Sequence, residues 1–258
     1  MDRSERDSDS APSGSDAGVA AMVYRIDGDM RYLSHQEEMR LLMRACARAR
    51  WPIAYSQGFN PQPLMGIPLP RSVGTAGGRQ WALIRLDQAR TARELFESLQ
   101  PVLAGHVTLH CVIAPLPHRR LHARRVEYRI PLESNDAALV APRLDQLLAS
   151  ESVSIMRTYG PGKPSREIDI RPFIGSITLD RDALRLSLVV DQQRTARPNE
   201  IMDTIGLSTE RYGHRTIRTE IDWVENVFAS PHWPVPPERT HCGHEDRSQD
   251  RQTSGHQA

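Results

Sequence analysis

The 258-residue chain contains 39% hydrophobic and 5% aromatic residues, and its 33 basic and 32 acidic side chains leave a net charge of +1. This composition excludes a collagen, a coiled coil and a disulfide-rich scaffold, and the near-neutral charge argues neither for nor against a nucleic-acid partner. No apolar run reaches about 18 residues and no secretory signal opens the sequence. We therefore expect a cytoplasmic protein with no membrane partner.

Polar segments flank a more apolar middle region. Residues 1–20 and 228–258 cannot bury enough apolar surface to offset the entropy lost on ordering, so they are predicted to be disordered tails. A stretch rich in proline, histidine and arginine at 115–125 divides the middle region. We therefore predict two folded domains, residues 21–117 and 118–227.

The first domain opens with a strand-like run at 22–32, followed by a helix at 34–50. Ser34 and Glu37 have the spacing of a capping box, in which each side chain accepts a hydrogen bond from the other residue's backbone N–H. The later expected elements are a short strand at 53–55, a loop at 57–63, an extended segment at 64–70, a strand at 80–86, a helix at 91–103 and a strand at 107–113. This β-α-β-β-α-β order is that of a ferredoxin-like sandwich.

The second domain repeats that order less cleanly. Apolar side chains alternate from Leu184 to Val190, which is typical of a half-buried strand. The predicted fold class is α+β, with two ferredoxin-like sandwiches in tandem and disordered ends. The expected elements of the second domain are a strand at 126–132, a helix at 136–148, a strand at 153–158, a hairpin of 166–179 and 184–191, a helix at 198–205 and a strand at 216–224.

His35 occupies the first helical position after the Ser34 cap. The positive end of the helix dipole disfavours protonation there, and a neutral imidazole can act as a general base or a metal ligand. The alternative is a half-exposed polar residue beside a cap. His35 is the candidate catalytic residue. No metal site is predicted, because the tail motif at 241–244 lacks a second ligand pair at zinc-finger spacing.

The segment from Tyr55 to Pro63 combines amides, prolines, a glycine and an aromatic residue. Gly58 permits a positive φ, and the prolines stiffen the chain that follows it. A rigid loop that presents amides and an aromatic face suits recognition of a base or another planar ligand. The alternative is an ordinary loop with Phe59 in the core. The candidate substrate-binding residues are Tyr55, Gln57, Gly58, Phe59 and Asn60, and Gln62 closes the same loop.

Two groups of arginines are candidates for phosphate binding. Arg40 and Arg44 lie on one face of the first helix, and Arg124 and Arg125 belong to a cluster that begins in the linker. Such clusters can form a basic surface for phosphates. The alternative is a solvated helix face and a polar linker.

Charged and apolar residues alternate from Arg166 to Pro172, so that Glu167, Asp169 and Arg171 share one side of an extended segment. One interpretation is a polar site on that face, with Asp169 and Arg171 as further substrate-binding residues. The alternative is a charge ladder on an open sheet face. If the two domains share a cleft, we expect His35, Asp169 and Arg171 to converge there with the loop.

Four segments together resemble the radical-SAM-linked family, a bacterial domain of unknown function. They are Arg31-Tyr32-Leu33-Ser34-His35, the run from Pro52 to Pro61, Lys163 with Arg166 to Pro172, and Thr195-Ala196-Arg197-Pro198. The resemblance covers roughly residues 22–226. Gln62 replaces the usual histidine of the family, and Leu64-Met65-Gly66-Ile67 departs from its usual basic start.

The resemblance implies association with a radical-SAM enzyme, either as a fused domain or as a separate neighbour. This chain has no C-x-x-x-C-x-x-C motif, so it is expected to bind no cofactor itself. The partner enzyme would carry the iron–sulfur cluster and S-adenosylmethionine.

Three functional hypotheses follow, in order of preference. The first is a non-catalytic accessory protein that binds a substrate, RNA being favoured, through the Gln57–Gln62 loop and nearby arginines. The second is a metal-independent RNA-processing enzyme with His35 as general base. The third is a purely structural protein-interaction module.

Overall fold

The computed structural model describes residues 18–116, 120–158, 162, 164–180, 182–192, 194–224 and 240–242. The expected N-terminal tail lies outside the described residues up to residue 17, and so does the expected C-terminal tail apart from 240–242. Lys163 of the resemblance and Arg119 of the linker cluster are also outside them. Among the described residues, no helix has the length and hydropathy needed to cross a membrane.

The first half follows the expected order of elements with shifted boundaries. The capping box is confirmed: Ser34 Oγ accepts from the Glu37 N–H at 3.4 Å, and Glu37 Oε2 accepts from the Ser34 N–H at 2.8 Å. The first strand ends earlier than predicted, because residues 28–32 form a 3₁₀ helix. The elements are β1 (Val19–Ile26), α1 (His35–Arg48), β2 (Met65–Gly66), β3 (Ala76–Arg85), α2 (Ala92–Leu103) and β4 (Thr108–Leu116).

The second half contains one departure that changes the topology. The predicted strand at 166–179 is interrupted, since residues 171–173 form a 3₁₀ helix and the part before it pairs into a separate two-stranded sheet. The elements are β5 (Ala123–Pro131), α3 (Ser134–Ala149), β6 (Ser154–Arg157), β7 (Arg166–Asp169), β8 (Ile174–Leu179), β9 (Ala183–Val189), α4 (Pro198–Ile205), α5 (Thr209–Tyr212) and β10 (Ile217–Trp223).

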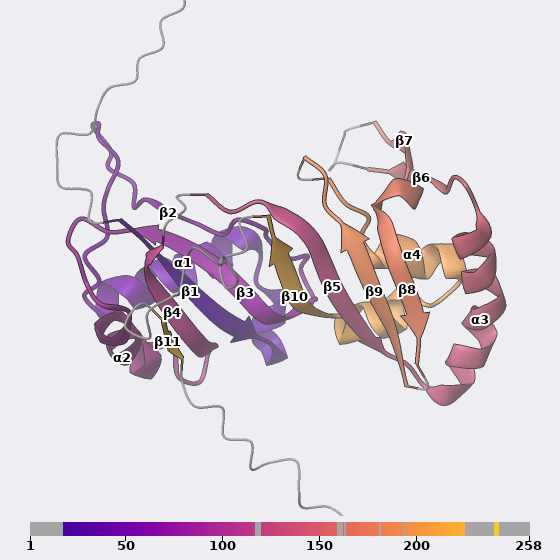
Figure 1. Cartoon of the computed structure of the whole chain (residues 1–258), viewed down its shortest axis with the longest axis horizontal. Helices are drawn as coiled ribbons and strands as arrows, with labels where there is room; N and C mark the ends of the chain where they lie inside the picture. Colours follow the sequence, from indigo (N-terminus) through magenta and orange to yellow (C-terminus); the bar gives the residue numbers. More distant parts are fainter. Residues whose placement is uncertain are drawn as a thin grey trace, which may run out of the picture.

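The fold is α+β, and one mostly antiparallel sheet runs through both halves (Figure 1). Its strand order is β11-β4-β1-β3-β10-β5-β9-β8, with β2 paired to β3 and with β11 formed by Thr240–Cys242. β10 joins the halves: Ile217 and Arg218 pair in parallel with Ala76 and Gly77 of β3, and the rest of β10 pairs antiparallel with β5. The halves are therefore connected by hydrogen-bonded strands as well as by the chain between β4 and β5.

Each half has a helix-covered core. In the first half, alternate residues of β1 such as Met22 and Tyr24 pack against α1 and α2. In the second half, β5, β8 and β9 pack against α3 and α4 around Leu186 and Ile201. A third cluster lies on the other face of β1 and β3, where Trp81 meets Trp223 edge to face at 5.7 Å between ring centroids. This last contact ties β10 to the first half by packing as well.

A buried polar cluster lies where α1 begins. Glu38 Oε2 is 3.1 Å from Arg71 Nε, and the Tyr24 hydroxyl donates to Glu38 Oε1 at 2.7 Å. Arg71 also donates to the carbonyls of Met30 and Leu33, at 3.0 and 3.2 Å. Burial and the Glu38 carboxylate hold the pKa of Tyr24 well above its usual value, so this phenol stays a proton donor. The cluster fixes the entry to α1 against β1 and the segment before β3.

Candidate functional site

The loop between Ser56 and Gln62 is a closed, exposed hairpin. The Ser56 N–H donates to the Gln62 carbonyl at 2.8 Å, and the Gln62 N–H donates to Ser56 Oγ at 2.9 Å. Gly58 at its tip has φ +133°, a conformation that disfavours any side chain. Phe59 beside it is fully exposed. The segment projects as a narrow loop at the upper left of the molecule (Figure 1), so the expectation that Phe59 could be a core residue is wrong.

The chain leaving this loop forms one wall of a pocket of about 610 Å³. The Arg85 N–H donates to the Leu64 carbonyl at 2.9 Å, and Met65 and Gly66 then pair with β3 as the short strand β2. The pocket floor lies on the face of β1 and β3 that points away from α1 and α2. The lining residues are Val19, Pro63, Leu64, Met65, Gly66, Ile67, Pro68, Leu83, Arg85, Arg120, Leu121 and His122.

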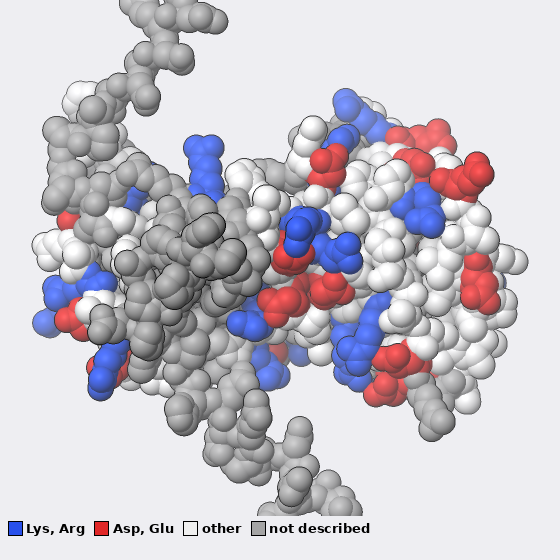
Figure 2. Space-filling view, viewed as in Figure 1, with Lys and Arg blue, Asp and Glu red and all other residues white. Residues whose placement is uncertain are grey.

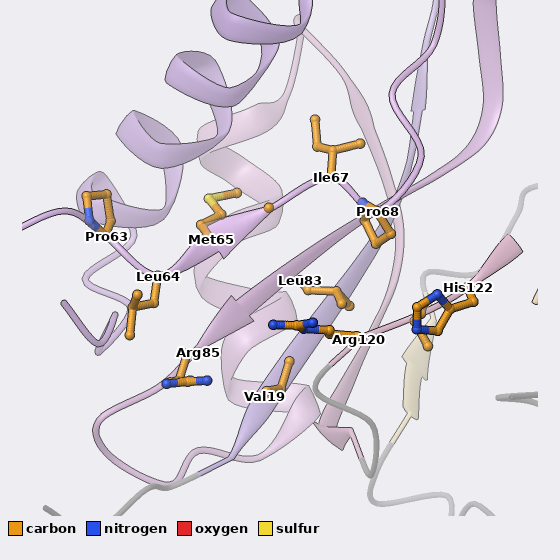
Figure 3. A pocket seen from close by; sticks show the side chains of 12 residues that line it. Val19, Pro63, Leu64, Met65, Ile67, Pro68, Leu83, Arg85, Arg120 and His122 are labelled. Carbon is orange, nitrogen blue, oxygen red and sulfur yellow. The ribbon is translucent and has the colours of Figure 1, made fainter. Parts of the chain in front are cut away.

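The pocket combines an apolar floor with basic groups and no acidic ones. Val19 and Leu83 form the floor, and Figure 3 shows the guanidinium groups of Arg85 and Arg120 pointing toward each other above it. His122 stands beside Pro68 at the opposite end (Figure 3). Within the described residues, neither Arg85 nor Arg120 forms an ion pair with a carboxylate. Both charges are therefore available to an anionic ligand.

The alternation of β3 explains how an arginine enters an apolar face. Trp81 and Leu83 point to the same side as Arg85, while Ala82 and Ile84 between them point into the first core. Arg85 pairs with Val19 across the strands, so its stem covers the floor of the pocket. Arg85 is not among the site residues predicted from the sequence. The sequence does contain a signal for it, because Arg85 follows Trp81 and Leu83 at alternate positions and therefore shares their face of the strand.

Residues 20–198 match the family described as "Uncharacterized protein conserved in bacteria (DUF2344)". The chain belongs to this family. The match covers the loop, most of the pocket and the second half as far as the first residue of α4. No curated protein matches the chain.

In this DUF2344 protein, His35 lies apart from the loop. It is the first residue of α1, it is exposed, and it forms no hydrogen bond or ion pair with another described residue. Residue 53, where the chain turns toward the loop, comes just after the other end of α1. A helix of 14 residues rises about 20 Å, so His35 and the loop lie at opposite ends of the first half.

The arginines expected to bind phosphate differ in their surroundings. Arg40 and Arg44 are exposed on α1. Arg124 forms an ion pair with Asp222 at 2.8 Å, and Arg125 donates to Ser187 Oγ at 3.3 Å. Figure 2 shows basic and acidic side chains interspersed over this middle part of the molecule. The β5–β10 surface is therefore a mixed-charge surface and not a basic patch.

Asp169 and Arg171 hold the backbone of the second half. Asp169 Oδ1 accepts from the N–H groups of Val153 and Arg171 at 2.8 and 2.9 Å, and the Val153 bond is the main reason that the pKa of Asp169 lies below its usual value. The Arg171 guanidinium donates to the carbonyls of Leu148 and Ser150 at the end of α3. Figure 1 shows β7 at the top of the second half and α1 in the first half, so these residues do not converge with His35.

The described part of the chain contains no group of three or more His, Cys, Asp or Glu side chains placed to hold a metal ion. Cys46 is buried in the first core, and burial raises the pKa of its thiol to about 12. This thiol therefore serves in packing and not as a nucleophile at neutral pH.

Proposed function

We propose that this DUF2344 protein binds single-stranded RNA without transforming it, and presents it to a partner enzyme. The proposed binding surface, called the loop pocket below, consists of the Ser56–Gln62 loop and the pocket that it borders. The observation that carries the proposal is the pair of guanidinium groups, Arg85 and Arg120, above an apolar floor and without carboxylate partners.

The chemistry of the loop pocket matches the parts of a nucleotide. Guanidinium groups bind phosphate oxygens in a two-pronged geometry, and this contact is the usual source of affinity for nucleic acid. Exposed aromatic rings such as Tyr55 and Phe59 offer faces on which unpaired bases stack. The side-chain amides of Gln57 and Asn60 are exposed on the same loop and can bond to base edges. A flexible single strand can reach both the loop tip and the pocket.

The partner in this proposal is a radical-SAM enzyme, which would supply the iron–sulfur cluster and S-adenosylmethionine. The motif resemblance at Arg31–His35 and Pro52–Pro61 supports this partner. The exposed, unpartnered His35 gives no support to the alternative of an RNA-processing enzyme, because no described side chain orients its imidazole.

We further infer that each half is a ferredoxin-like unit. The strand orders β4-β1-β3-β2 and β10-β5-β9-β8, all antiparallel, support this inference because they follow the same pattern relative to chain order. Two features are additions to that plan. β2 has only two residues, and the β6–β7 hairpin is inserted between α3 and β8.

The test measures the affinity for a fluorescein-labelled single-stranded RNA over a range of salt concentrations. For single strands, each phosphate contact contributes about 0.7 to the slope of log affinity against log salt. The double substitution Arg85→Ala/Arg120→Ala is expected to weaken binding and to make the slope shallower by about 1.4. The matched control is Arg93→Ala/Arg185→Ala, which removes two exposed arginines that pair with Glu97 and Asp180 elsewhere.

Equal salt slopes for the pocket variant and the control variant would contradict the proposal. So would an equal loss of affinity in both, because that result would come from net charge and not from this site.

A further inference from the structure

Four charged side chains are buried in the described part of the chain: Glu38, Arg71, Arg157 and Arg218. Arg71 pairs with Glu38, and Arg157 pairs with Glu200 at 2.6 Å. Arg218, which is 1% exposed, pairs with no carboxylate. Buried charges are normally compensated, because the desolvation of an unpaired ion costs several kcal/mol. The positive charge of Arg218 is therefore the unusual feature of this interior.

The groups that accept hydrogen bonds from the Arg218 guanidinium are neutral, and the Glu38 carboxylate of the buried cluster acts on it only from a longer distance. It donates to the carbonyls of Pro70 and Leu69, at 3.1 and 2.8 Å, and to the side-chain oxygen of Gln80. Its Nε has no hydrogen-bond partner. Burial is the largest influence on the pKa of Arg218 and lowers it, while Tyr128, Tyr24 and Glu38 act in the opposite direction. An arginine nevertheless keeps its proton at neutral pH.

Arg218 lines a cavity of about 250 Å³ between the two halves. Ser72 reaches it from the first half, and Tyr128, Thr195 and Arg197 reach it from the second. No acidic residue lines it, and the Arg197 guanidinium forms no ion pair among the described residues, although the Arg197 N–H donates to Glu200 Oε2 at 2.8 Å. Thr195 Oγ1 is buried without a hydrogen-bond partner. Two arginines and a threonine with an orphaned hydroxyl thus belong to the lining of one small cavity.

We propose that this cavity binds a phosphate-class oxyanion. A tetrahedral dianion would compensate Arg218, pair with Arg197 and accept a hydrogen bond from Thr195, so that one ligand accounts for all three observations. The volume favours a small anion, because cavities for larger organic ligands usually measure about 300–1,000 Å³. The Thr195-Ala196-Arg197-Pro198 segment supplies four of the lining positions, the last of which is the first residue of α4.

This anion site is independent of the proposed RNA function, since Pro68 is the only residue that lines both cavities. The oxyanion has two possible sources, a free phosphate or the terminal phosphate of an RNA strand. Either source presents the same chemistry to Arg197 and Arg218, so the experiment separates them.

Binding of inorganic phosphate to the full chain is measured by calorimetry at constant ionic strength, with chloride as the reference salt. We expect saturable binding to the wild type and at least tenfold weaker binding to Arg197→Gln, which replaces an exposed side chain and leaves the core intact. Arg93→Gln, on the outer face of α2, is the matched control and is expected to bind as the wild type does.

Thr195→Val separates ligand binding from a merely structural role. Valine removes the orphaned hydroxyl, so the variant is expected to be as stable as the wild type or more stable without phosphate. Its affinity for phosphate is nevertheless expected to fall about fivefold, since one hydrogen bond to the ion is lost. A variant that loses stability and keeps its phosphate affinity would show a structural hydroxyl and overturn this assignment.

Two oligonucleotide probes identify the source. A preference for a 5′-phosphorylated over a 5′-hydroxyl RNA, lost in Arg197→Gln, would support the cavity and assign it to an RNA end. Equal affinity for the two probes, together with binding of inorganic phosphate, would support it and assign it to a free anion. No binding of phosphate beyond that of chloride, or binding unchanged in Arg197→Gln, would overturn the proposal.

Discussion

Phe59 stands fully exposed at the tip of a loop that two hydrogen bonds close, so its ring is free for the stacking contact proposed above. Its position beside Gly58 leaves it no route to the core without opening the Ser56–Gln62 contacts. The Phe59 side chain therefore contributes no packing to the core, which agrees with the proposed role of this loop in RNA recognition.

Phe59→Ala is expected to weaken binding of single-stranded RNA by about 5- to 150-fold, the usual range for the loss of one stacked base. Its free energy of unfolding should stay close to that of the wild type, because the side chain has no packing to lose. Fluorescence anisotropy and urea unfolding measure the two quantities. Leu139→Ala, which truncates an exposed apolar side chain on α3, is the control for affinity; a similar loss in both variants would contradict a stacking role.

Asp169 provides a pH-dependent contribution to stability. Hydrogen bonds from the N–H groups of Val153 and Arg171 lower the pKa of its carboxyl below the usual 3.8. The contribution is therefore fully present above the pKa of the unfolded chain, about 3.9, and is lost as the pH falls through the lower folded-state pKa.

Asp169→Asn is accordingly expected to be less stable than the wild type at pH 6, with a difference that shrinks as the pH falls below about 4. Urea unfolding at a series of pH values gives this difference. Asp87→Asn, whose exposed carboxylate accepts no hydrogen bond from a described residue, is the control. A difference for Asp169→Asn that does not change with pH would show that the charge of this carboxylate is irrelevant.

At the scale of elements, the pairing of β3 with β10 includes Gly77, which lies opposite Arg218 and allows the Gln80 side chain to pack closely against its backbone. A Cβ at this position would lie 2.4 Å from the Cγ and Cδ atoms of Gln80, and Gln80 is buried and bonded to Arg218. The Gln80 side chain therefore has little freedom to move away from a Cβ atom at position 77.

Gly77→Ala is expected to destabilise the protein by about 1–3 kcal/mol, the usual cost of overpacking. Gly66→Ala is the control for stability, because a Cβ at Gly66 would meet nothing within 4 Å. Thermal and urea unfolding compare the two variants. Equal stabilities would mean that Gln80 rearranges freely and that the pairing of β3 with β10 is looser than its contacts imply.

The elements that could be predicted from the sequence are those with local determinants. Ser34 and Glu37, which lie three positions apart, define the start of α1, and Pro198 is the first residue of α4 as predicted. The 3₁₀ helix at 171–173 was missed because Asp169 and Arg171 act through backbone atoms distant in sequence, at Val153 and Leu148. Alternating charge alone could not distinguish that role from a charge ladder.

The candidate site was predictable only in part for the same reason. Phe59 and its neighbours form a local motif, so the loop could be identified. Arg85 and Arg120 belong to segments that meet only in the folded chain. The ion pair between Arg124 and Asp222, which engages a predicted phosphate-binding arginine, likewise joins residues that are distant in sequence.

At the scale of the whole molecule, β10 couples the two cores. It pairs with β3 and β5, and Trp223 packs against Trp81 of the first half. Among the described residues, Trp51 reports on the first core, and Trp81 and Trp223 report on the contact between β3 and β10.

A core substitution in the second half should therefore be felt by these tryptophans. Leu188→Ala, at a fully buried position beside β5, is expected to cost about 2–5 kcal/mol. Tryptophan fluorescence and far-UV circular dichroism should then give coincident transitions, both at lower denaturant than in the wild type. A fluorescence midpoint that stays at the wild-type value while circular dichroism shows two steps would mean that the halves unfold independently.

The place of β10 also has a consequence for synthesis. β10 lies between β3 and β5, yet it follows both by many residues along the chain (Figure 1). A nascent chain that has emerged only as far as α4 holds β1 to β9 but has no partner for these edges of β3 and β5. Exposed edges of this kind invite pairing with other chains. A chain that is released after truncation between residues 205 and 217 is therefore expected to aggregate more readily than the full chain.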